Sequence, residues 1–367
     1  MKFVDFINTT EHRQEYDEIV SLGFNCAVAF ALKDLYLRNK SYPLDWGRVV
    51  EEKDEIGFRR KVEFLCTNFK DFINEQDLYI FSDNKNEENK KHMAVHNSFN
   101  GMHFFHDFPK GKTIADVYPD VKEKYERRIE RLMDLINSDK KICFVFYAGL
   151  AKLPMAEIIY STEIFYKIFP KRNVDFLILQ NDPDIGDEVV YENLSDNVRR
   201  ILFYNGPNDK TVQLEMSKIV PNIRRILNAL VKAGDKKTDF STNELNSNNR
   251  VDDIITNPKP DFKGMISFGP YAPVDSGAHS VVVKYDLTAN YRAFFDVACD
   301  LGKIVVPKTE LPHDTNSFKF DFNLNKNVSD LEVRFYCEPT EIIDENNRFK
   351  LFGIHIDWYD VVNKNRG

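Results

Sequence analysis

The chain has 367 residues, of which 43% are hydrophobic and 29% charged, and its formal net charge is −8. This length favours two domains. The acidic balance argues against a general nucleic-acid or membrane-surface binder, because phosphate binding needs a basic face. No apolar stretch approaches the ~20 residues that span a bilayer, and the N-terminal segment lacks the apolar region of a signal peptide. We therefore expect a cytoplasmic protein with no membrane span.

The first motif joins a short apolar strand, residues 19–22, to a helix that begins near residue 26. Gly23 ends the strand, and Asn25 is a suitable helix N-cap. Cys26 is then expected in the first helical turn, where unpaired N–H groups and the helix dipole favour a thiolate. A packed, inert thiol is the alternative, and it is the role we expect for the four other cysteines, Cys66, Cys143, Cys299 and Cys337.

The second motif is SYPLDW, residues 41–46. Pro43 restricts the backbone, and Asp45 and Trp46 stand side by side. The Asp45 carboxylate could hold an imidazole in the tautomer that catalysis needs, as the acid of a catalytic triad does. It could equally serve as the N-cap of a following helix. Both roles stay open, and we expect Trp46 to contact a substrate.

The third motif is GMHFFHDFP, residues 101–109. A nucleophilic thiol needs a base, and the base needs an orienting group. His106 is the candidate base, Asp107 a candidate orienting acid, and His103 a candidate substrate contact. If the stretch is an extended strand, strict alternation places His106 on one face and Asp107 on the other. A histidine in a surface loop is the alternative.

Residues 82–98 are polar and lack periodicity, so they predict a loop. His92 and His96 within them stand four residues apart, as two metal ligands on a helix would. The loop-like surroundings and the lack of a matching third ligand favour chance spacing. The sequence therefore predicts no metal site.

The segment from residue 17 to 233 alternates between short apolar runs and longer amphipathic stretches. This alternation predicts a mostly parallel sheet covered by helices on both faces, a three-layer α/β domain over residues 1–233. Ligands bind beyond the carboxyl ends of the strands in such sheets, and Cys26 follows one such end. The expected strands are 141–149, 174–180 and 199–205, and the expected helices include 117–138 and 157–169.

Residues 234–259 are rich in Asn, Asp, Ser and Lys, and they predict a linker. Residues 260–362 then show short runs with period-two alternation, separated by turn residues at intervals of about ten. This pattern is typical of an antiparallel β-sandwich or jelly roll.

Taken together, the motifs of the N-terminal part resemble a family. SLGFNC, SYPLDW, HDF and the KYERRI helix before a strand stand here in the order found in the bacterial proteins catalogued as papain-like cysteine peptidases, whose function is uncharacterised. The resemblance covers residues 17 to 206 and implies that Cys26 is the nucleophile, His106 the base and Asp45 the acid. Because the cysteine follows a strand in an α/β alternation, the expected arrangement is closer to SGNH-like and Rossmann-like enzymes than to papain.

The C-terminal part is similar to β-sandwich modules of enzymes that act on bacterial surface polysaccharides. FGPYAPVDSG and LEVRFYCEP carry this weaker likeness. It implies carbohydrate binding, in which Tyr271 and Trp358 would stack on sugar rings. Aromatic residues in such positions are more often packing residues.

The expected function is thiol-dependent acyl transfer or hydrolysis on a bacterial capsular or surface polysaccharide or its precursor. Cys26, His106 and Asp45 or Asp107 would be catalytic, and substrate contacts would come from Asn25, Trp46, His103, Tyr271 and Trp358. No cofactor is required, although acetyl-CoA is a candidate acyl donor. The alternatives are a cysteine peptidase or amidase, a glycosyltransferase using the loop NDPDIGDE, and a non-catalytic glycan-binding component of capsule biosynthesis.

Overall fold

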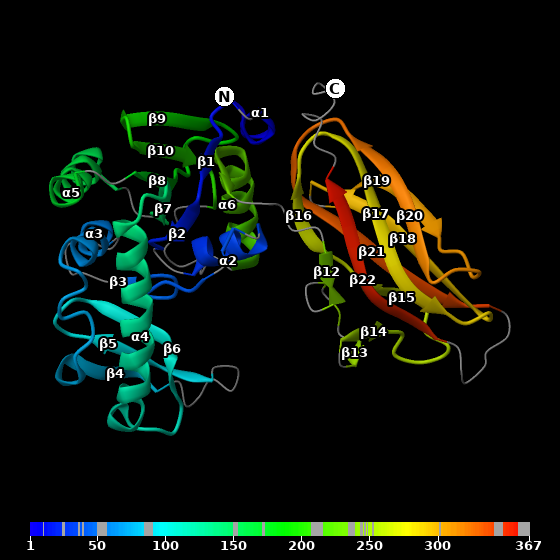
Figure 1. Ribbon diagram of the computed structural model, residues 1–367, viewed down its shortest axis with the longest axis horizontal. Helices are drawn as coiled ribbons and strands as arrows, with labels where there is room; N and C mark the ends of the chain where they lie inside the picture. Colours follow the sequence, from blue (N-terminus) through cyan, green and yellow to red (C-terminus); the bar gives the residue numbers. More distant parts are fainter. Residues whose placement is uncertain are drawn as a thin grey trace. The chain divides into compact units, whose positions relative to one another are not determined.

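A computed structural model covers the chain (Figure 1). The chain divides into two compact units. The first holds residues 1–6, 10–33 and 37–234, and the second holds residues 7–9, 34–36 and 235–367. The structure describes residues 1–9, 11–23, 26–35, 37–38, 40–49, 57–83, 91–149, 153–170, 173–206, 216–233, 239–242, 245, 247, 249–251, 253–300, 302–340 and 348–358.

The first unit is built on a five-stranded sheet in the order β2-β7-β8-β10-β9. The first four of these strands run parallel, and β9 is antiparallel to β10. Every residue of β7 and β8 is buried, as expected for strands covered on both faces. The mixture of helices and sheets is as predicted. The strands are β2 (Glu18–Ser21), β7 (Ile142–Tyr147), β8 (Val174–Asn181), β9 (Val189–Ser195) and β10 (Val198–Phe203).

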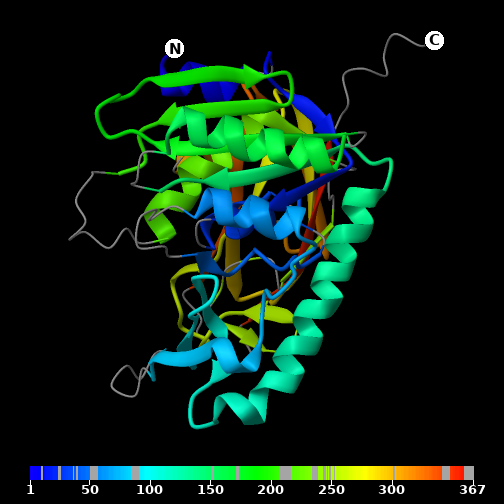
Figure 2. The ribbon, with the colours of Figure 1, turned by 90° about the vertical axis from the view of Figure 1, so that its left-hand side faces the viewer.

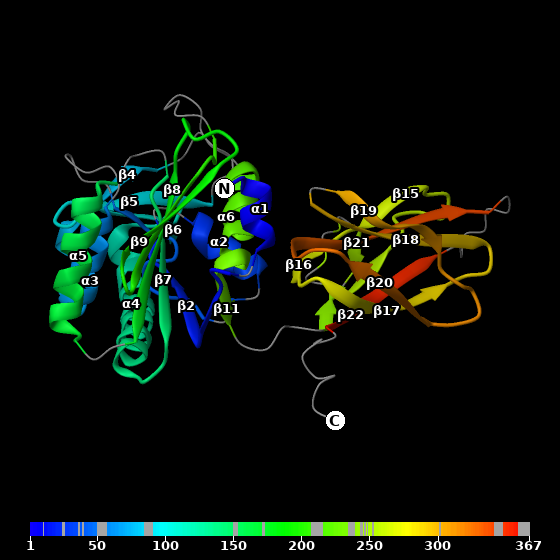
Figure 3. The ribbon, with the colours of Figure 1, turned by 90° about the horizontal axis from the view of Figure 1, so that it is seen from above.

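Helices lie on both sides of this sheet, with α3 and α5 on one side and α1, α2 and α6 on the other (Figure 3). Aromatic rings join the sheet to α3 and α5: Phe58 lies 5.0 Å from Phe146, and Phe165 lies 5.1 Å from Phe176, between ring centroids. A short parallel pair of β1 and β11 adds to this unit. The elements are α1 (Phe3–Asn8), α2 (Ala27–Asp34), α3 (Phe58–Cys66), α5 (Met155–Ile168), α6 (Met216–Leu230), β1 (Gln14–Tyr16) and β11 (Val231–Ala233).

A four-stranded antiparallel sheet, in the order β3-β6-β5-β4, packs against the long helix α4 (Figures 1 and 2). The Tyr125 ring of α4 lies 5.4 Å from both Phe72 and Phe104, so aromatic packing holds the helix to one face of the sheet. The elements are β3 (Arg48–Val49), η1 (Glu75–Asp77), β4 (Leu78–Ser82), β5 (His92–Asn97), β6 (Met102–Pro109) and α4 (Ile114–Asn137).

Part of the stretch expected to be a loop is the strand β5. Residues 92–97 pair with β4 on one side and β6 on the other, while residues 84–90 lie outside the described part of the chain. Polar residues flank a short buried run, Met93 to Val95. Burial of this run between two partner strands favours the strand conformation over a loop.

The second unit contains two antiparallel sheets, compatible with the expected β-sandwich. One sheet has the order β13-β14-β22-β17-β20, with β12 also paired to β22, and the other has the order β15-β21-β18-β19, with β16 paired to β21. Buried aromatic side chains such as Tyr285, Phe295 and Phe335 fill its core. The strands are β12 (Asp239–Ser241), β13 (Arg250–Val251), β14 (Ile254–Thr256), β15 (Gly264–Ser267), β16 (Pro270–Val274), β17 (Gly277–Leu287), β18 (Tyr291–Cys299), β19 (Lys303–Glu310), β20 (Ser317–Leu324), β21 (Val328–Pro339) and β22 (Phe349–Trp358).

Three of these strands, β12, β13 and β14, fall within the segment 234–259, whose composition predicts a linker. β12 and β14 both pair with β22, so this stretch contributes to the second unit. The strands are only two or three residues long, and so short a run is not visible as alternation in a polar sequence. Within the described residues, no helix is long and apolar enough to cross a membrane.

Gly57, the N-cap of α3, is required by the fold and yields a stability prediction. It has φ of +62°, and a Cβ added there would stand 2.6 Å from the Cβ of Val49. Gly57→Ala should lower the free energy of unfolding by about 2 kcal/mol or more, because left-handed strain of about 1 kcal/mol adds to the clash. Gly111→Ala is the matched control, since Gly111 has φ of +79° and open space around it. Equal losses in urea titrations of the two variants would contradict the proposed close packing.

Candidate functional site

Cys26 lies at the joint between the first strand of the parallel sheet and α2. β2 ends at Ser21, and the carbonyl oxygen of Cys26 accepts the helical bond from the N–H of Phe30 at 2.9 Å. Cys26 therefore stands at the N-terminal edge of α2, at the carboxyl end of a parallel strand, as predicted. Its side chain is half-buried and forms no disulfide. The expected N-cap and substrate contact, Asn25, lies outside the described residues.

The environment of the Cys26 thiol does not favour the thiolate, which corrects the expectation from the sequence. Burial raises the pKa of the thiol above its ordinary value, and a hydrogen bond from the residue's own backbone opposes this only in part. Withdrawal from water disfavours the charged form more than the N-terminal end of a short helix favours it. The Cys26 side chain is therefore a neutral thiol at neutral pH.

Lys61 of α3 lies beneath the segment that leads to Cys26. Its side chain is fully buried, and its Nζ donates to the carbonyl oxygens of Leu22 at 2.7 Å, of Gly23 and of Gly47 at 3.1 Å. Burial lowers the pKa of Lys61 to about 7, with the positive charge of Arg48 acting in the same direction. Sequence analysis missed this residue. The available signal was its place three residues after Phe58 on the apolar stripe of α3.

Asp45 is buried, and its carboxylate is bound within its own loop. Oδ2 accepts from the Arg38 guanidinium at 2.7 and 3.1 Å and from the Tyr42 N–H at 2.8 Å. Burial raises the pKa of Asp45 even though the Arg38 charge opposes the shift. The sequence left open whether Asp45 orients an imidazole or caps a helix. The observed contacts instead join its carboxylate to Arg38 and to the Tyr42 N–H within the SYPLDW turn. No hydrogen bond between described residues joins it to an imidazole.

A series of aromatic contacts runs from the Cys26 helix to His106. The Phe30 ring of α2 lies 5.3 Å from Trp46, and Trp46 lies 6.1 Å from His106, both edge to face. The Arg38 guanidinium lies 5.1 Å from the centre of the Trp46 ring, so the same arginine supports Asp45 and Trp46. Trp46 is thus placed between the helix of the candidate nucleophile and the candidate base. No hydrogen bond between described residues joins Cys26 to His106.

A bulge in β6 turns His106 outward, and this corrects the simple alternation expected from the sequence. Met93 pairs with Phe108 and Val95 with Phe104, so three residues of β6 face one residue of β5. As a result His106 is exposed, whereas the Asp107 side chain is turned inward and only 7% exposed.

Asp107 binds α4 rather than the imidazole beside it. Its carboxylate accepts from the Lys124 ammonium and, at 2.9 Å, from the Tyr125 hydroxyl. The role of orienting His106 through a hydrogen bond therefore has no support in the described contacts. Although His106 is exposed, the surrounding chain removes part of its water, and this partial desolvation lowers the pKa of His106, opposed in part by the charge of Asp107. The imidazole is consequently neutral at pH 7 and able to accept a proton.

The face of the four-stranded sheet that carries His103 bears a row of rings. Tyr79, His96 and His103 lie on adjacent strands, with ring centroids 5.1 and 4.2 Å apart. Burial lowers the pKa of His103 to about 4, so this ring is neutral. The exposed rings of Phe81 and Phe105 lie 5.5 and 5.7 Å from His103. Within the described residues no three His, Cys, Asp or Glu side chains are arranged to hold a metal.

Two residues of the second unit, Tyr271 and Trp358, were expected to contact a carbohydrate. Tyr271 is half-buried, has φ of +62°, and its ring lies 6.1 Å from Phe268. The backbone of Trp358 pairs with His279 at the end of β22, and its side chain lies outside the described part of the structure. The NDPDIGDE loop includes a turn in which the Asp184 N–H donates to the Asp182 carboxylate.

Comparison with known proteins supports the resemblance carried by the N-terminal motifs. Residues 17–160 match the model of the family described as "Putative papain-like cysteine peptidase (DUF1796)". That range contains Cys26, Asp45 and His106. The family description suggests an enzyme with cysteine-dependent catalysis.

One similar curated protein is "Uncharacterized protein R408" of Acanthamoeba polyphaga mimivirus, 29% identical over 138 residues. The match covers 34% of this chain and 59% of that protein, so the chain spans about three fifths of its length.

Solved structures with some similarity include two carbohydrate-binding modules and an esterase. The family 35 module from Clostridium thermocellum has a TM-score of 0.23 at 13% identity, with 33% of this chain and 96% of that chain covered. The C-terminal CBM6 of LamC from Zobellia galactanivorans has a TM-score of 0.22 at 14% identity, covering 33% and 98%. A two-domain esterase active on acetylated mannans has a TM-score of 0.22 at 11% identity, covering 66% and 83%. TM-scores of this size do not establish a shared fold.

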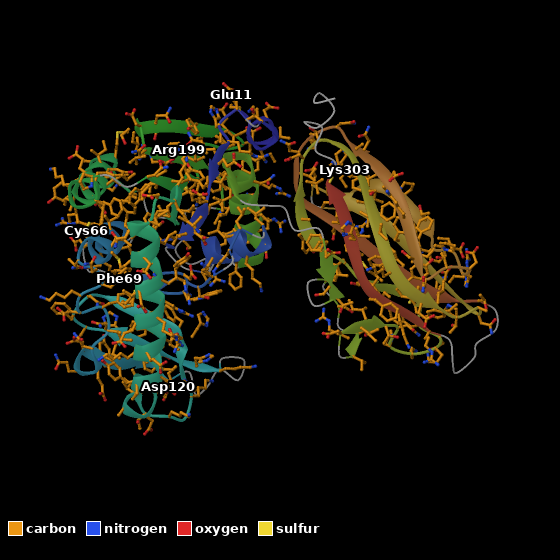
Figure 4. The ribbon with its side chains drawn as sticks, in the orientation of Figure 1. Glu11, Cys66, Phe69, Asp120, Arg199 and Lys303 are labelled. Atoms are coloured by element: carbon orange, nitrogen blue, oxygen red, sulfur yellow. The ribbon has the colours of Figure 1, made fainter. Side chains whose placement is uncertain are left out.

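The raised pKa of Cys26 yields a prediction for its alkylation by iodoacetamide. Because only the thiolate reacts, the rate at Cys26 should rise with pH through a midpoint above the ordinary cysteine value. Cys66, at the end of α3 (Figure 4), should titrate near pH 11, because burial raises its pKa to about 11. Peptide mass spectrometry across a pH series resolves the two sites. A Cys26 midpoint below that of free cysteine would contradict the neutral thiol.

Proposed function

We propose that the first unit is a cysteine-dependent enzyme that transfers or hydrolyses acyl groups, with Cys26 as nucleophile and His106 as base. The observation that carries this proposal is the place of Cys26, at the carboxyl end of a parallel strand and the start of α2, one short series of rings away from an exposed imidazole. Ligand sites of parallel sheets lie at such ends. The proposed arrangement of the unit is SGNH-like or Rossmann-like, within residues 1–233.

The protonation states favour general-base catalysis over a preformed ion pair. The pKa of Cys26 is raised and that of His106 is lowered, so both groups are neutral before reaction. The Cys26 Sγ attacks the acyl carbonyl while its proton passes to His106. The leaving group departs with that proton, and an acyl-thioester remains on Cys26. Water or an acceptor hydroxyl then attacks the thioester and gives its proton to His106. The carbon–sulfur bond breaks, and His106 returns that proton to the Cys26 sulfur, so thiol and imidazole are again neutral.

Because no hydrogen bond between described residues joins Cys26 to His106, the proposed proton transfer requires a closer approach of the two groups in the reactive complex. Catalytic hydrogen bonds are often long in ligand-free proteins and tighten when substrate binds. Trp46 lies between α2 and His106 and is the proposed substrate contact. His103 is the second proposed substrate contact. Its ring is neutral and lies beside the ring of His96 on one face of the four-stranded sheet.

The proposed substrate class is an acylated bacterial surface polysaccharide or its precursor, with acetyl-CoA as a candidate donor. The family description keeps peptide or amide cleavage as the alternative. Both substrate classes pass through the same acyl-thioester, so a small activated ester tests the shared chemistry first.

Treatment with 4-nitrophenyl acetate should release nitrophenolate and leave one acetyl group on the peptide that contains Cys26. Cys26→Ser should lose the acetylated peptide and most of the burst, because the hydroxyl is a weaker nucleophile at the same position. His106→Gln should lower the acetylation rate by about 10²-fold or more, the usual contribution of a general base. Intact-protein and peptide mass spectrometry measure both.

Cys66→Ser is the matched control for the thiol, since Cys66 is the other half-buried cysteine, and it should keep the wild-type rate. Full acetylation of another residue in Cys26→Ser would refute the assignment of the nucleophile. The fall of the rate towards acid pH should have its midpoint below the ordinary histidine value, because burial lowers the pKa of His106.

We also propose that the second unit, within residues 260–362, binds a carbohydrate chain. Tyr271 supports this, because a non-glycine residue with φ of +62° in a strand is strained, and such strain gathers at binding sites.

Tyr271→Ala in the full chain should weaken retention on a polysaccharide affinity gel that retains the wild type, while Phe352→Ala should not. Phe352 is the control because it is also an aromatic residue of the second unit and 44% exposed. Equal retention of Tyr271→Ala and wild type would exclude Tyr271 from the binding site.

A further inference from the structure

Lys61 is a buried lysine whose hydrogen bonds to described residues go to backbone carbonyls of the segment before Cys26 and of the residue after Trp46. Its side chain is fully buried, and Nζ donates to Leu22 O, Gly23 O and Gly47 O. An ammonium group has three N–H donors, so its hydrogen-bonding capacity is matched by these three acceptors. Because the acceptors are backbone carbonyls, these hydrogen bonds restrain the path of the backbone at those residues.

The three carbonyls belong to the segments that place the candidate nucleophile and the candidate substrate contact. Leu22 and Gly23 lie between the end of β2 and Cys26, and Gly47 directly follows Trp46. One side chain of α3 therefore ties the Cys26 segment to the SYPLDW segment. Neither segment has regular secondary structure where Lys61 binds it.

The contact with Leu22 also determines the direction of the next amide. In a planar trans peptide the C=O and the following N–H point in opposite directions. Because Leu22 O faces Lys61, the Gly23 N–H points away from Lys61. Gly23 is buried, and its N–H has no hydrogen bond to another residue of the described chain. Buried N–H groups without an acceptor are rare in native structures.

We propose that Lys61 is a positioning residue that holds the Gly23 N–H as a donor to the oxyanion formed when Cys26 attacks an acyl carbonyl. This inference rests on the proposed function. When the sulfur–carbon bond forms, the carbonyl electron pair moves onto oxygen, and the negative charge there accepts from the Gly23 N–H. The amide is already directed and has no competing acceptor among the described residues, so little reorganisation accompanies the reaction.

Two reactions of the same sulfur separate this role from general support of the loop. Acetylation by 4-nitrophenyl acetate passes through an oxyanion, whereas alkylation by iodoacetamide displaces iodide at carbon and forms none. Loss of an aligned oxyanion donor lowers only the first rate. A general disturbance of the Cys26 segment changes both.

The experiment measures both rates in the full chain for Lys61→Met, Lys61→Gln and Lys61→Arg, after thermal melting has shown which variants are folded. Lys61→Met removes every donor and keeps the length of the side chain. Lys61→Gln and Lys61→Arg keep at least two N–H groups, so they satisfy more of the carbonyls if Lys61→Met fails to fold. Arg60→Met is the control, because Arg60 lies on the same helix and is 38% exposed.

Lys61→Met should acetylate about 10²-fold more slowly, the effect of one oxyanion donor, with alkylation changed less than about threefold. Lys61→Gln should also be slowed, and Lys61→Arg should recover part of the rate. Unchanged acetylation in a folded Lys61→Met or Lys61→Gln would overturn the inference, and so would an equal fall in both rates. If wild-type Cys26 is not acetylated at all, the proposed function fails; a normally acetylated wild type with insensitive Lys61 variants refutes only the role of Lys61.

Discussion

The contact on which the candidate site most depends is the one between the Lys61 ammonium and three backbone carbonyls. Placing a cation in the interior is unfavourable unless its donors are satisfied, and here two irregular segments supply the acceptors. The lysine and the carbonyls each depend on the other for a hydrogen-bond partner. The carbonyls of Leu22, Gly23 and Gly47 would be buried without a donor if the lysine were absent, and the lysine would be unpaired if either segment moved. Lys61 therefore links the segment that leads to Cys26 with the residue that follows Trp46.

The other half of the site depends on how β6 departs from regular pairing. Three residues of β6 stand opposite one residue of β5, so His106 and Asp107 are released from strict alternation. The inward turn of Asp107 is stabilised by Lys124 and Tyr125 of α4. Because α4 holds the carboxylate, the neighbouring imidazole is left exposed and can contact Trp46. Asp107 thus affects the orientation of His106 through the backbone of β6 and not through a hydrogen bond to the imidazole.

The sequence was sufficient where a feature is local. The strand–glycine–helix pattern around Cys26 predicted its place, because the apolar run, the turn and the helix lie within a few residues. The sequence was insufficient where the role of a side chain depends on a partner from another segment. Asp45 is bound by Arg38 and Asp107 by α4, and neither pairing follows from spacing. The pKa of Cys26 depends on burial by the surrounding chain. Lys61 could have been noticed as a lysine on the apolar stripe of α3, but its acceptors lie on two segments outside α3.

The pKa shifts of thiol and imidazole have the same origin and lead to one chemical consequence. Both groups are partly withdrawn from water, and burial favours the neutral form of each. A thiolate–imidazolium pair would need two charges where the surroundings favour none. In the proposed reaction, charge therefore develops only during attack, as the proton leaves sulfur and the carbonyl oxygen becomes negative. In such a reaction the donors to that oxygen contribute more to the rate than a lowered thiol pKa would, which is why the direction of one glycine amide, fixed by a buried lysine, matters to the proposed chemistry of Cys26.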